Sequence, residues 1–567
     1  QLIQEASVTG GQNAEEWSGV ALPLVRRIFG ELAAQDFVSV QPMNLPSGLI
    51  FYLDFKYGTD QTSLHANNSD VYGNTSGSNV DASGGLYGAG KFGYSINDNI
   101  TAEATIKADE FKSRRIKLAT KLEPNAIAIF QGAPSETGYV KFRQNNEFYY
   151  LTGIETPHAY LVIKGGTGET SLYLPHKNPR RERSEGPLFS SEDVEEVKLL
   201  NGVENVYSTE MMGEHLWRMR MRSKPIVYLY QSPPERHAES RDLLLRYEGD
   251  IQNDPWDHTE PRYKNFNKNI SNQMHGSKIK DITHILDGLR LIKSKAEIEI
   301  LKKATVLSCL GLMEAMRSTK PDMYEYELDG MAKYIYHING AQGDAYYSLI
   351  ANGSNAYMPH YHKKNDKLKD GDLMLMDYSP DYQYYMSDIT RMIPVNGKFS
   401  EEQSQLYGFY VACYRAILEK IRPFIEPVEV RKEAAEKMKQ ILSTAKFNQP
   451  HHRKAAENFV ENYIRSSKRE YASLGHGVGM ATHDVGDHSK MLLPGMVFTI
   501  EPALRVPEEN IYIRLEDLII ITETGIEVVS DFVPMDIKGI EKLMREKGML
   551  DRYKPLTEEG YKKYLNK

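Results

Sequence analysis

The 567-residue sequence has few cysteines, no long apolar run and no excess of basic side chains. Only Cys309 and Cys413 occur, each inside an apolar, helix-like segment, which excludes a disulfide framework and predicts two buried, unreactive thiols. No uninterrupted apolar stretch approaches the roughly 18 residues that span a bilayer. With 69 basic against 77 acidic residues, the net charge of −8 does not favour nucleic acid as a partner. We therefore expect neither a membrane nor a nucleic acid among the partners.

The sequence begins at Gln1 and lacks a basic segment followed by an apolar signal core. We expect a cytoplasmic location, and export after signal cleavage stays open as an alternative because no initiator Met precedes Gln1. The composition, 41% hydrophobic and 26% charged, is typical of globular proteins. Because single cores stop growing near about 250 to 300 residues, the length predicts two to four domains.

Residues 1–107, called the leader below, differ in composition from the rest of the chain. Residues 59–99 are dense in Gly, Ser, Asn and Asp, which is typical of a loop or linker. The more ordered segments before them, at residues 23–29, 37–44 and 48–51, resemble the amino-terminal arm of major capsid proteins of T4-like tailed phages. This resemblance has three possible explanations: a natural gene fusion, a chimera of two reading frames, or a coincidental match. We assign the leader no catalytic role.

Two structured domains are predicted after the leader. Residues 108–285 combine a helical start with apolar strands at residues 126–130, 159–163 and 225–230, which indicates an α/β domain. Residues 286–567 open with a capping box, Ser294 with Glu297, before a long amphipathic helix. A second helix is predicted from Ser400, with an apolar face made of Leu406, Phe409, Tyr410, Cys413 and Ile417.

Four acidic residues occur where the surrounding sequence should be buried. The apolar strand at residues 373–377 ends in Asp377, residues 379–381 are predicted to turn, and the returning strand carries Asp388. Glu501 follows the apolar strand at residues 496–500. Glu516 ends the segment 511–516, which runs directly into a further strand; by alternation it shares a face with Arg514 and Tyr512.

A cation is needed to balance these acids, because an isolated buried carboxylate costs several kcal/mol. Arg514 could pair with one of them but not with four. Two divalent ions would balance the charge, and oxygen donors with one imidazole suit Mn²⁺, with Fe²⁺, Co²⁺ and Zn²⁺ as alternatives. The imidazole is expected from His476, whose glycine neighbours would allow close approach to the metal. Any one of these acids alone is more often an ordinary surface residue, but the set predicts metal-assisted hydrolysis.

The motifs around these positions resemble the metal-binding motifs of the pita-bread metallopeptidases. Over about residues 108–540 the chain is similar to the Xaa-Pro aminopeptidase and prolidase branch of that superfamily. The resemblance implies an α/β amino-terminal domain before an α+β pita-bread catalytic domain. It also implies that two ions, most closely fitting Mn²⁺, are held by Asp377, Asp388, His476, Glu501 and Glu516.

The same resemblance implies the catalytic roles. Glu501 would be the general base for a water that bridges the ions, and Arg514 belongs to the same site. His360 would contact the substrate near the scissile amide, and His483 would bind its carbonyl and steady the tetrahedral intermediate. The sequence departs from the family at Ala472, where a substrate-lining histidine is usual, and at residues 503–505. Specificity is therefore less determined than mechanism.

The implied activity is hydrolysis of the amino-terminal Xaa-Pro bond of peptides by a homo-oligomeric metalloenzyme. An Xaa-Pro dipeptidase is the alternative within enzymes, since it would share all five ligands. A non-catalytic peptide-binding module and, from the leader alone, a virion structural protein are the alternatives from other classes.

Overall fold

The computed structural model of the protein describes residues 106–469 and 473–555. All described residues belong to one compact unit. The predictions for the leader up to residue 105, and the departure at Ala472, lie outside the described residues. Among the helices of the described ranges, none is both long and apolar enough to cross a membrane.

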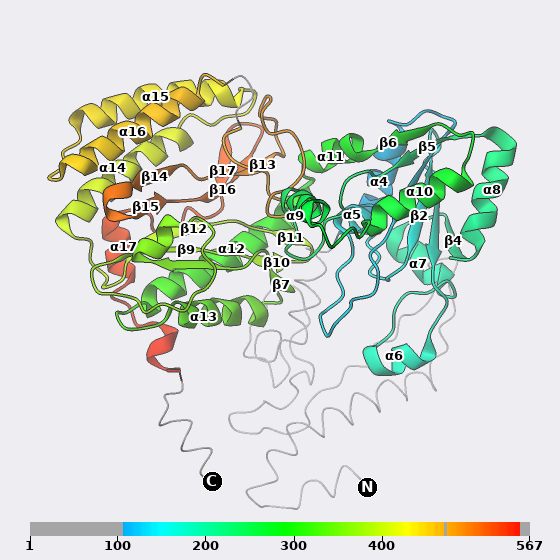
Figure 1. Cartoon of the computed structure of the whole chain (residues 1–567), viewed down its shortest axis with the longest axis horizontal. Helices are drawn as coiled ribbons and strands as arrows, with labels where there is room; N and C mark the ends of the chain where they lie inside the picture. The colour runs from blue at the N-terminus through cyan, green and yellow to red at the C-terminus, as the bar shows by residue number, and fades with distance from the viewer. Residues whose placement is uncertain (1–105, 470–472, 556–567) are drawn as a thin grey trace, which may run out of the picture. The chain divides into compact units, whose positions relative to one another are not determined.

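A six-stranded mixed sheet organises the first half of the described chain (Figure 1). Its order is β4-β3-β2-β1-β5-β6, in which β2 pairs antiparallel with β1 and β3, and the remaining pairs are parallel. The strands are β1 (Ala126–Gln131), β2 (Tyr160–Lys164), β3 (Thr170–Leu174), β4 (Asn205–Ser208), β5 (Ile226–Leu229) and β6 (Ile279–Asp281). The helices are α4 (Ala108–Ala119), α5 (Asn146–Thr152), α6 (Pro179–Glu185), α7 (Val194–Asn201), α8 (Met211–Ser223), α9 (Arg241–Asn253), α10 (Arg262–Gln273) and α11 (Thr283–Leu291).

Both faces of this sheet are buried, as the continuous apolar run of β1 requires. Ala128 and Phe130 belong to one hydrophobic cluster together with α4 and α5, whereas Ile127 and Ile129 belong to another with α8 and α10. Successive side chains of a strand point to opposite faces, so one strand contributes to both cores. The three strands predicted at residues 126–130, 159–163 and 225–230 are confirmed as β1, β2 and β5.

The second half combines long helices with short antiparallel sheets. Its helices are α12 (Lys295–Ser318), α13 (Glu325–Ile338), η1 (Gly353–Tyr357), α14 (Glu401–Leu418), α15 (Pro427–Thr444), α16 (Pro450–Ser466), η2 (Pro507–Glu509), α17 (Ile537–Leu543) and η3 (Met549–Asp551). Its strands are β7 (Gly343–Asp344), β8 (Leu349–Asn352), β9 (Leu373–Asp377), β10 (Pro380–Tyr382), β11 (Tyr385–Met386), β12 (Thr390–Pro394), β13 (Val497–Ile500), β14 (Ala503–Val506), β15 (Ile511–Arg514), β16 (Asp517–Ile521) and β17 (Ile526–Val528).

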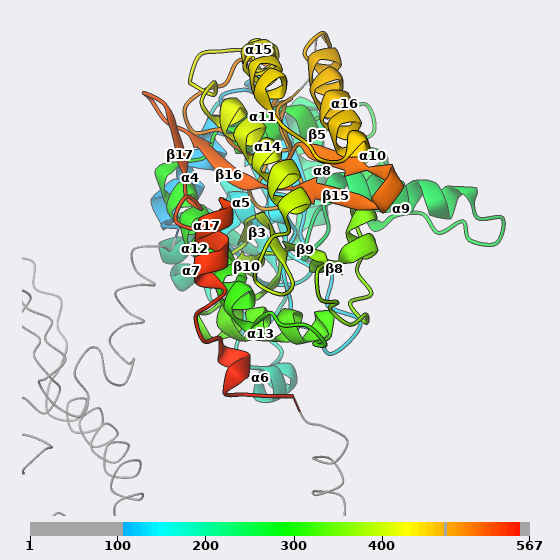
Figure 2. The same cartoon turned by 90° about the vertical axis from the view of Figure 1, so that its left-hand side faces the viewer.

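The predicted helix starts are confirmed. Ser294 and Glu297 form a capping box at the start of α12, and Ser400 and Gln403 form one at α14. The predicted apolar face of α14 is buried. Helices α14, α15 and α16 pack against one another, and α16 lies beside β14 (Figures 1 and 2).

The hairpin that follows β9 differs from the predicted one. Residues 379–381 do not form the turn, because Pro380–Tyr382 are strand β10, which pairs with β11. The turn lies at Gln383 and Tyr384, whose φ angles of 50° and 71° are those that a tight hairpin needs. The ring of Tyr384 stacks on Tyr149 of α5, with centroids 3.5 Å apart. Packing against a distant helix therefore accompanies a turn that local propensity does not indicate.

The segment 511–521 is also two strands instead of one nearly continuous run. Strand β15 pairs with β14, whereas β16 pairs with β13 in a different sheet. At the junction, the backbone of Glu516 pairs with Thr390, the first residue of β12. This change of partner places Glu516 where two sheets meet.

Candidate metal centre

The predicted acids lie at the ends of strands that are paired to one another. Asp377 ends β9, and the register of the pair places it opposite Thr390, two residues after Asp388. Thr390 in turn forms a bridge with Glu516, and Glu501 directly follows β13. The strand ladder therefore brings together acids that are 139 residues apart in sequence at their most distant, Asp377 and Glu516 (516 − 377).

His476 connects the acids of this cluster. Its Nε2 lies 3.5 Å from Asp388 Oδ2, 3.5 Å from Glu501 Oε1 and 3.7 Å from Glu516 Oε1. Asp388, His476 and Glu516 offer ligand atoms that all lie within 4.8 Å of one another. All five predicted ligand side chains are thus in one cluster, to which Tyr346 and Arg514 join Asp377.

Tyr346 and Arg514 complete the cluster. The Tyr346 hydroxyl lies 2.6 Å from Asp377 Oδ1 and 2.7 Å from Asp388 Oδ1. It has one proton, so it can donate to only one of the two carboxylates at a time. Arg514 donates to Asp377 and, at 3.4 Å, to Glu501. Sequence reasoning includes Arg514 but misses Tyr346, because a tyrosine after Ala345 carries no distinctive signal.

The pKa values show how crowded the negative charges are. Burial, and then the charges of Glu516 and Asp377, raise the pKa of Asp388 well above its usual value. Burial and Glu516 raise the pKa of Glu501 to about 7. Burial opposes the charged form of His476, but the neighbouring carboxylates of Glu516 and Glu501 prevail and raise its pKa to about 9. These shifts are the response of acids that share a site without enough positive charge.

The residues present fit a metal centre. The donors are four carboxylates and one imidazole, a set that suits hard to borderline divalent ions. Glu516 Oε1 is buried and has no hydrogen-bond partner among the described residues, whereas its other oxygen accepts from Thr390 at 2.7 Å. A buried carboxylate oxygen without a partner is costly, and a cation would satisfy it.

The glycines around His476 serve packing within the protein. A Cβ at Gly475 would lie 1.9 Å from the carbonyl oxygen of Thr499, and one at Gly477 would lie 2.2 Å from the ring of His488. A Cβ at Gly479 would lie 2.1 Å from the Asp484 carboxylate. The small residues predicted to leave room for metal and substrate thus leave room for β13 and two buried side chains.

His483 lies beside this cluster and is held by the first half of the chain. Its ring centroid is 4.3 Å from that of His476. Its Nδ1 is 2.8 Å from Asp242 Oδ2, and its backbone N–H donates to the hydroxyl of Ser240, both at the start of α9. No sequence signal points to Asp242, because its partner lies 241 residues away.

His360 is an exposed residue of the loop after η1. Its pKa is lowered, first by burial of the ring and then by the positive charge of Arg514, and Asp377 and His483 also act on it electrostatically. His360 therefore lies close enough to the cluster to be affected by its charges.

Buried ion pairs join the two halves of the chain close to His483. Arg290 donates to Glu235 at 2.8 Å and to Asp484 at 2.6 Å, and Lys293 donates to the other oxygen of Asp484 at 2.9 Å. These cations lower the pKa of Asp484 to about 2 despite its burial. Asp484, which directly follows His483, is thus held in place by Arg290 and Lys293.

The sequence matches three family profiles. Metallopeptidase family M24 matches residues 299–523, and the Aminopeptidase P N-terminal domain matches residues 111–228. Both agree with the predicted fold class, an α/β amino-terminal domain before an α+β catalytic one. The Major capsid protein Gp23 profile matches residues 14–146, and its last part overlaps α4 and β1 of the α/β domain.

Relatives extend the similarity over most of the chain. The Intermediate cleaving peptidase 55, mitochondrial, of Arabidopsis thaliana is 28% identical over 77% of this chain and 83% of its own length. The Xaa-Pro aminopeptidase of Escherichia coli strain K12 is 29% identical over 77% of this chain and 98% of its own length. The structure of proline aminopeptidase P II from Yersinia pestis, 29% identical, covers 78% of this chain and 100% of its own, with a TM-score of 0.62.

Proposed function

Since the chain is a metallopeptidase of family M24 with the amino-terminal domain of the aminopeptidases P, we propose that it hydrolyses the bond between the first residue of a peptide and a proline in second position. The observation that supports this most directly is the convergence of Asp377, Asp388, His476, Glu501 and Glu516 in one buried cluster. A catalytically inactive binding module would have no need to keep all five.

These five residues would hold two divalent ions, with Mn²⁺ as the proposed metal. Asp377 and Asp388 would bind one ion, and Asp388, Glu516, His476 and Glu501 would be shared between the pair. When bound, such ions polarise a scissile carbonyl and lower the pKa of a coordinated water toward about 7. Arg514 would keep Asp377 and Glu501 oriented, and Thr390 would do so for Glu516.

Glu501 is the proposed general base. A carboxylate beside a coordinated water can accept a proton from that water and return it to the leaving group. Its side chain is 30% exposed, more than those of Asp377, Asp388 and Glu516, so it is the acid of the cluster that substrate and water can reach.

Two histidines would act on the substrate. His483 directs Nδ1–H at Asp242, and in its protonated form it also presents Nε2–H as a hydrogen-bond donor for the carbonyl oxygen as negative charge develops on it. The negative charge of Asp242 favours this protonated form. His360 would contact the substrate near the scissile amide. Asp242 fixes the orientation of His483, which makes it a positioning residue supplied by the amino-terminal domain.

The boundaries follow the same proposal. We assign residues 1–107 to the leader, 108–285 to the amino-terminal domain and 286–567 to the catalytic domain. We also propose peptide substrates, a homo-oligomeric state and a cytoplasmic location.

Peptide hydrolysis by the metal-stripped full chain, with and without added Mn²⁺, tests the function. The substrates are an Xaa-Pro-Xaa tripeptide, an Xaa-Pro dipeptide and an Xaa-Ala-Xaa control. We expect Mn²⁺-dependent release of the first residue from the proline tripeptide only. Preference for the dipeptide would replace the proposal with a prolidase, and no turnover with Mn²⁺, Fe²⁺, Co²⁺ or Zn²⁺ would refute catalysis.

A further inference from the structure

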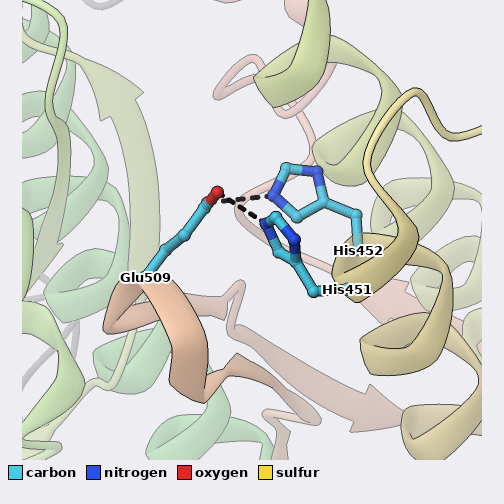
Figure 3. A group of neighbouring side chains, drawn as sticks. All are labelled: His451, His452 and Glu509. Atoms are coloured by element: carbon cyan, nitrogen blue, oxygen red, sulfur yellow. Dashed lines mark hydrogen bonds and ion pairs between the residues drawn. The ribbon is translucent and has the colours of Figure 1, made fainter.

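A second cluster of ligand-type side chains lies between α16 and η2. His451 and His452 follow Pro450 in the first turn of α16, and Glu509 ends η2, the short helix between β14 and β15. Figure 3 shows both imidazoles directed at the same carboxylate. The ligand atoms of the three residues all lie within 4.8 Å of one another. None of the three belongs to the proposed catalytic centre.

From this arrangement we propose that His451, His452 and Glu509 form a binding site for one divalent ion of the Zn²⁺ type. Two imidazole nitrogens and one carboxylate oxygen are a donor set that suits Zn²⁺, Co²⁺ and Ni²⁺, and not Mg²⁺ or Ca²⁺. Three protein ligands leave a fourth position for water, which the partial exposure of His451 and Glu509 allows.

The distances need only a small adjustment to admit an ion. His451 Nε2 lies 2.6 Å from Glu509 Oε1, and His452 Nε2 lies 2.9 Å from Glu509 Oε2. Ligand bonds of about 2.0 to 2.1 Å in a tetrahedron place donors about 3.3 Å apart. Each of these two histidine–carboxylate pairs would therefore separate by less than about 1 Å.

His452 can present the lone pair that a metal requires. Its side chain is only 3% exposed, so its direction is set by packing in α16, and Nε2 points at Glu509. Its Nδ1 is buried and has no hydrogen-bond partner among the described residues. The Glu509 carboxylate accepts a hydrogen bond from Nε2–H, so an ion would replace this proton, and the tautomer with the proton on Nδ1 then leaves Nε2 as the ligand.

Glu509 is the residue on which the site depends most. The first turn of a helix carries the positive end of the helix dipole, which by itself disfavours a cation beside His451 and His452. The carboxylate of Glu509 offsets this field and supplies the only negative charge of the three ligands. Loss of its charge should therefore weaken binding more than loss of the half-exposed ring of His451.

A bound ion would connect α16 to the far end of the β14–β15 hairpin. The other end of this hairpin is next to Glu501, and β15 ends in Arg514. The ion would therefore act as a structural link that restrains the hairpin. The four residue pairs of the hairpin separate this link from the Glu501 end by about 13 Å.

Zinc content of the full chain tests the proposal. Metal-stripped wild type, Glu509→Gln and His451→Ala are dialysed against Zn²⁺, and bound zinc is measured by mass spectrometry. The matched controls are Glu508→Gln, an exposed neighbour of Glu509, and His284→Ala, an exposed histidine of α11. We expect Glu509→Gln to hold one zinc fewer than wild type, His451→Ala to lose it at lower Zn²⁺ concentrations, and both controls to match wild type.

Thermal unfolding gives a second readout that does not depend on activity. Zn²⁺ should raise the melting temperature of Glu509→Gln less than that of Glu508→Gln. Equal zinc content and equal Zn²⁺-dependent shifts in these two variants would overturn the proposal and leave a hydrogen-bonded contact between α16 and η2. If both site variants fail to fold, anomalous diffraction at the zinc edge on wild-type crystals decides. A peak about 2 Å from the three side chains supports the site, and its absence overturns it.

Discussion

Replacement of Asp242 by Asn tests whether the amino-terminal domain contributes to catalysis through His483. The change keeps the shape of the side chain and an oxygen that can accept from Nδ1–H, but it removes the negative charge 2.8 Å from the ring. A hydrogen bond to a charged group contributes about 1.5 to 3 kcal/mol when it is shielded from water. Here the side chains of Asp242 and His483 are 53% and 40% exposed, so solvent screening reduces the effect to about 1 kcal/mol.

This energy belongs to the transition state, because His483 is proposed to stabilise charge that develops on the substrate carbonyl. About 1 kcal/mol corresponds to a roughly fivefold lower kcat with little change in KM. The assay is steady-state hydrolysis of the Xaa-Pro-Xaa tripeptide with saturating metal. Asp250→Asn, an exposed acid on the same helix, is the matched control and should retain wild-type kcat.

A double-mutant cycle separates positioning from a general structural effect. In a His483→Ala background the Asp242→Asn change should no longer alter kcat, because its partner is gone. An unchanged fivefold loss in that background would refute the proposed link between Asp242 and His483. So would a loss confined to KM, since that would indicate a role in substrate binding only.

Further predictions address the metal ligands, the packing of the His476 loop and the buried ion pairs. Glu501→Gln should lower kcat by about 10² to 10⁴, whereas Glu508→Gln should not. A chelator should abolish activity and lower the melting temperature, since the acids of the cluster lose the cations that balance them; Mn²⁺ should restore both. Gly475→Ala should reduce kcat at least tenfold because its Cβ would meet the Thr499 carbonyl at 1.9 Å, whereas Gly525→Ala, with nothing within 4 Å, should be silent. Asp484→Asn should lower the free energy of unfolding in denaturant by about 3 to 5 kcal/mol, and exposed Asp531→Asn should not. The pKa of Asp484 is about 2 in the folded protein, below the value of about 3.9 in the unfolded chain. Its ionisation therefore contributes about 2 kcal/mol to stability above about pH 3.9, and this contribution is lost as the pH falls toward 2. Asp484→Asn should lack this part of the acid sensitivity.

The grouping of the acids around His476 could be predicted from the sequence because the signal is local. An apolar strand that ends in a carboxylate, as at Asp377 or Glu501, shows that an acid is buried, and burial without a partner implies a cation. The capping boxes at Ser294 and Ser400 are equally local and are confirmed. Prediction fails where the partner is distant in sequence. The turn at Gln383 and Tyr384 packs on α5, and no short motif contains that information.

The missed site residues have the same cause. Tyr346 lies 31 and 42 residues before the carboxylates it contacts, and Asp242 lies 241 residues before His483. Neither residue stands in a pattern of its own. The division of residues 511–521 into two strands likewise depends on a change of sheet partner that alternation along one strand cannot reveal.

The position of His483 is held by contacts on two sides. If one of them is removed, activity should be lost before the protein unfolds. Its backbone and ring contact Ser240 and Asp242, while the next residue, Asp484, is held by Arg290 and Lys293. Removing the Asp484 charge leaves Arg290 and Lys293 buried with too little negative charge around them. The loop that carries His483 should therefore shift before the chain unfolds. Activity of Asp484→Asn should therefore fall at temperatures below its melting temperature. If activity and folded structure were lost together, the ion pairs would serve stability alone, and the coupling of the two domains to catalysis would rest on Asp242.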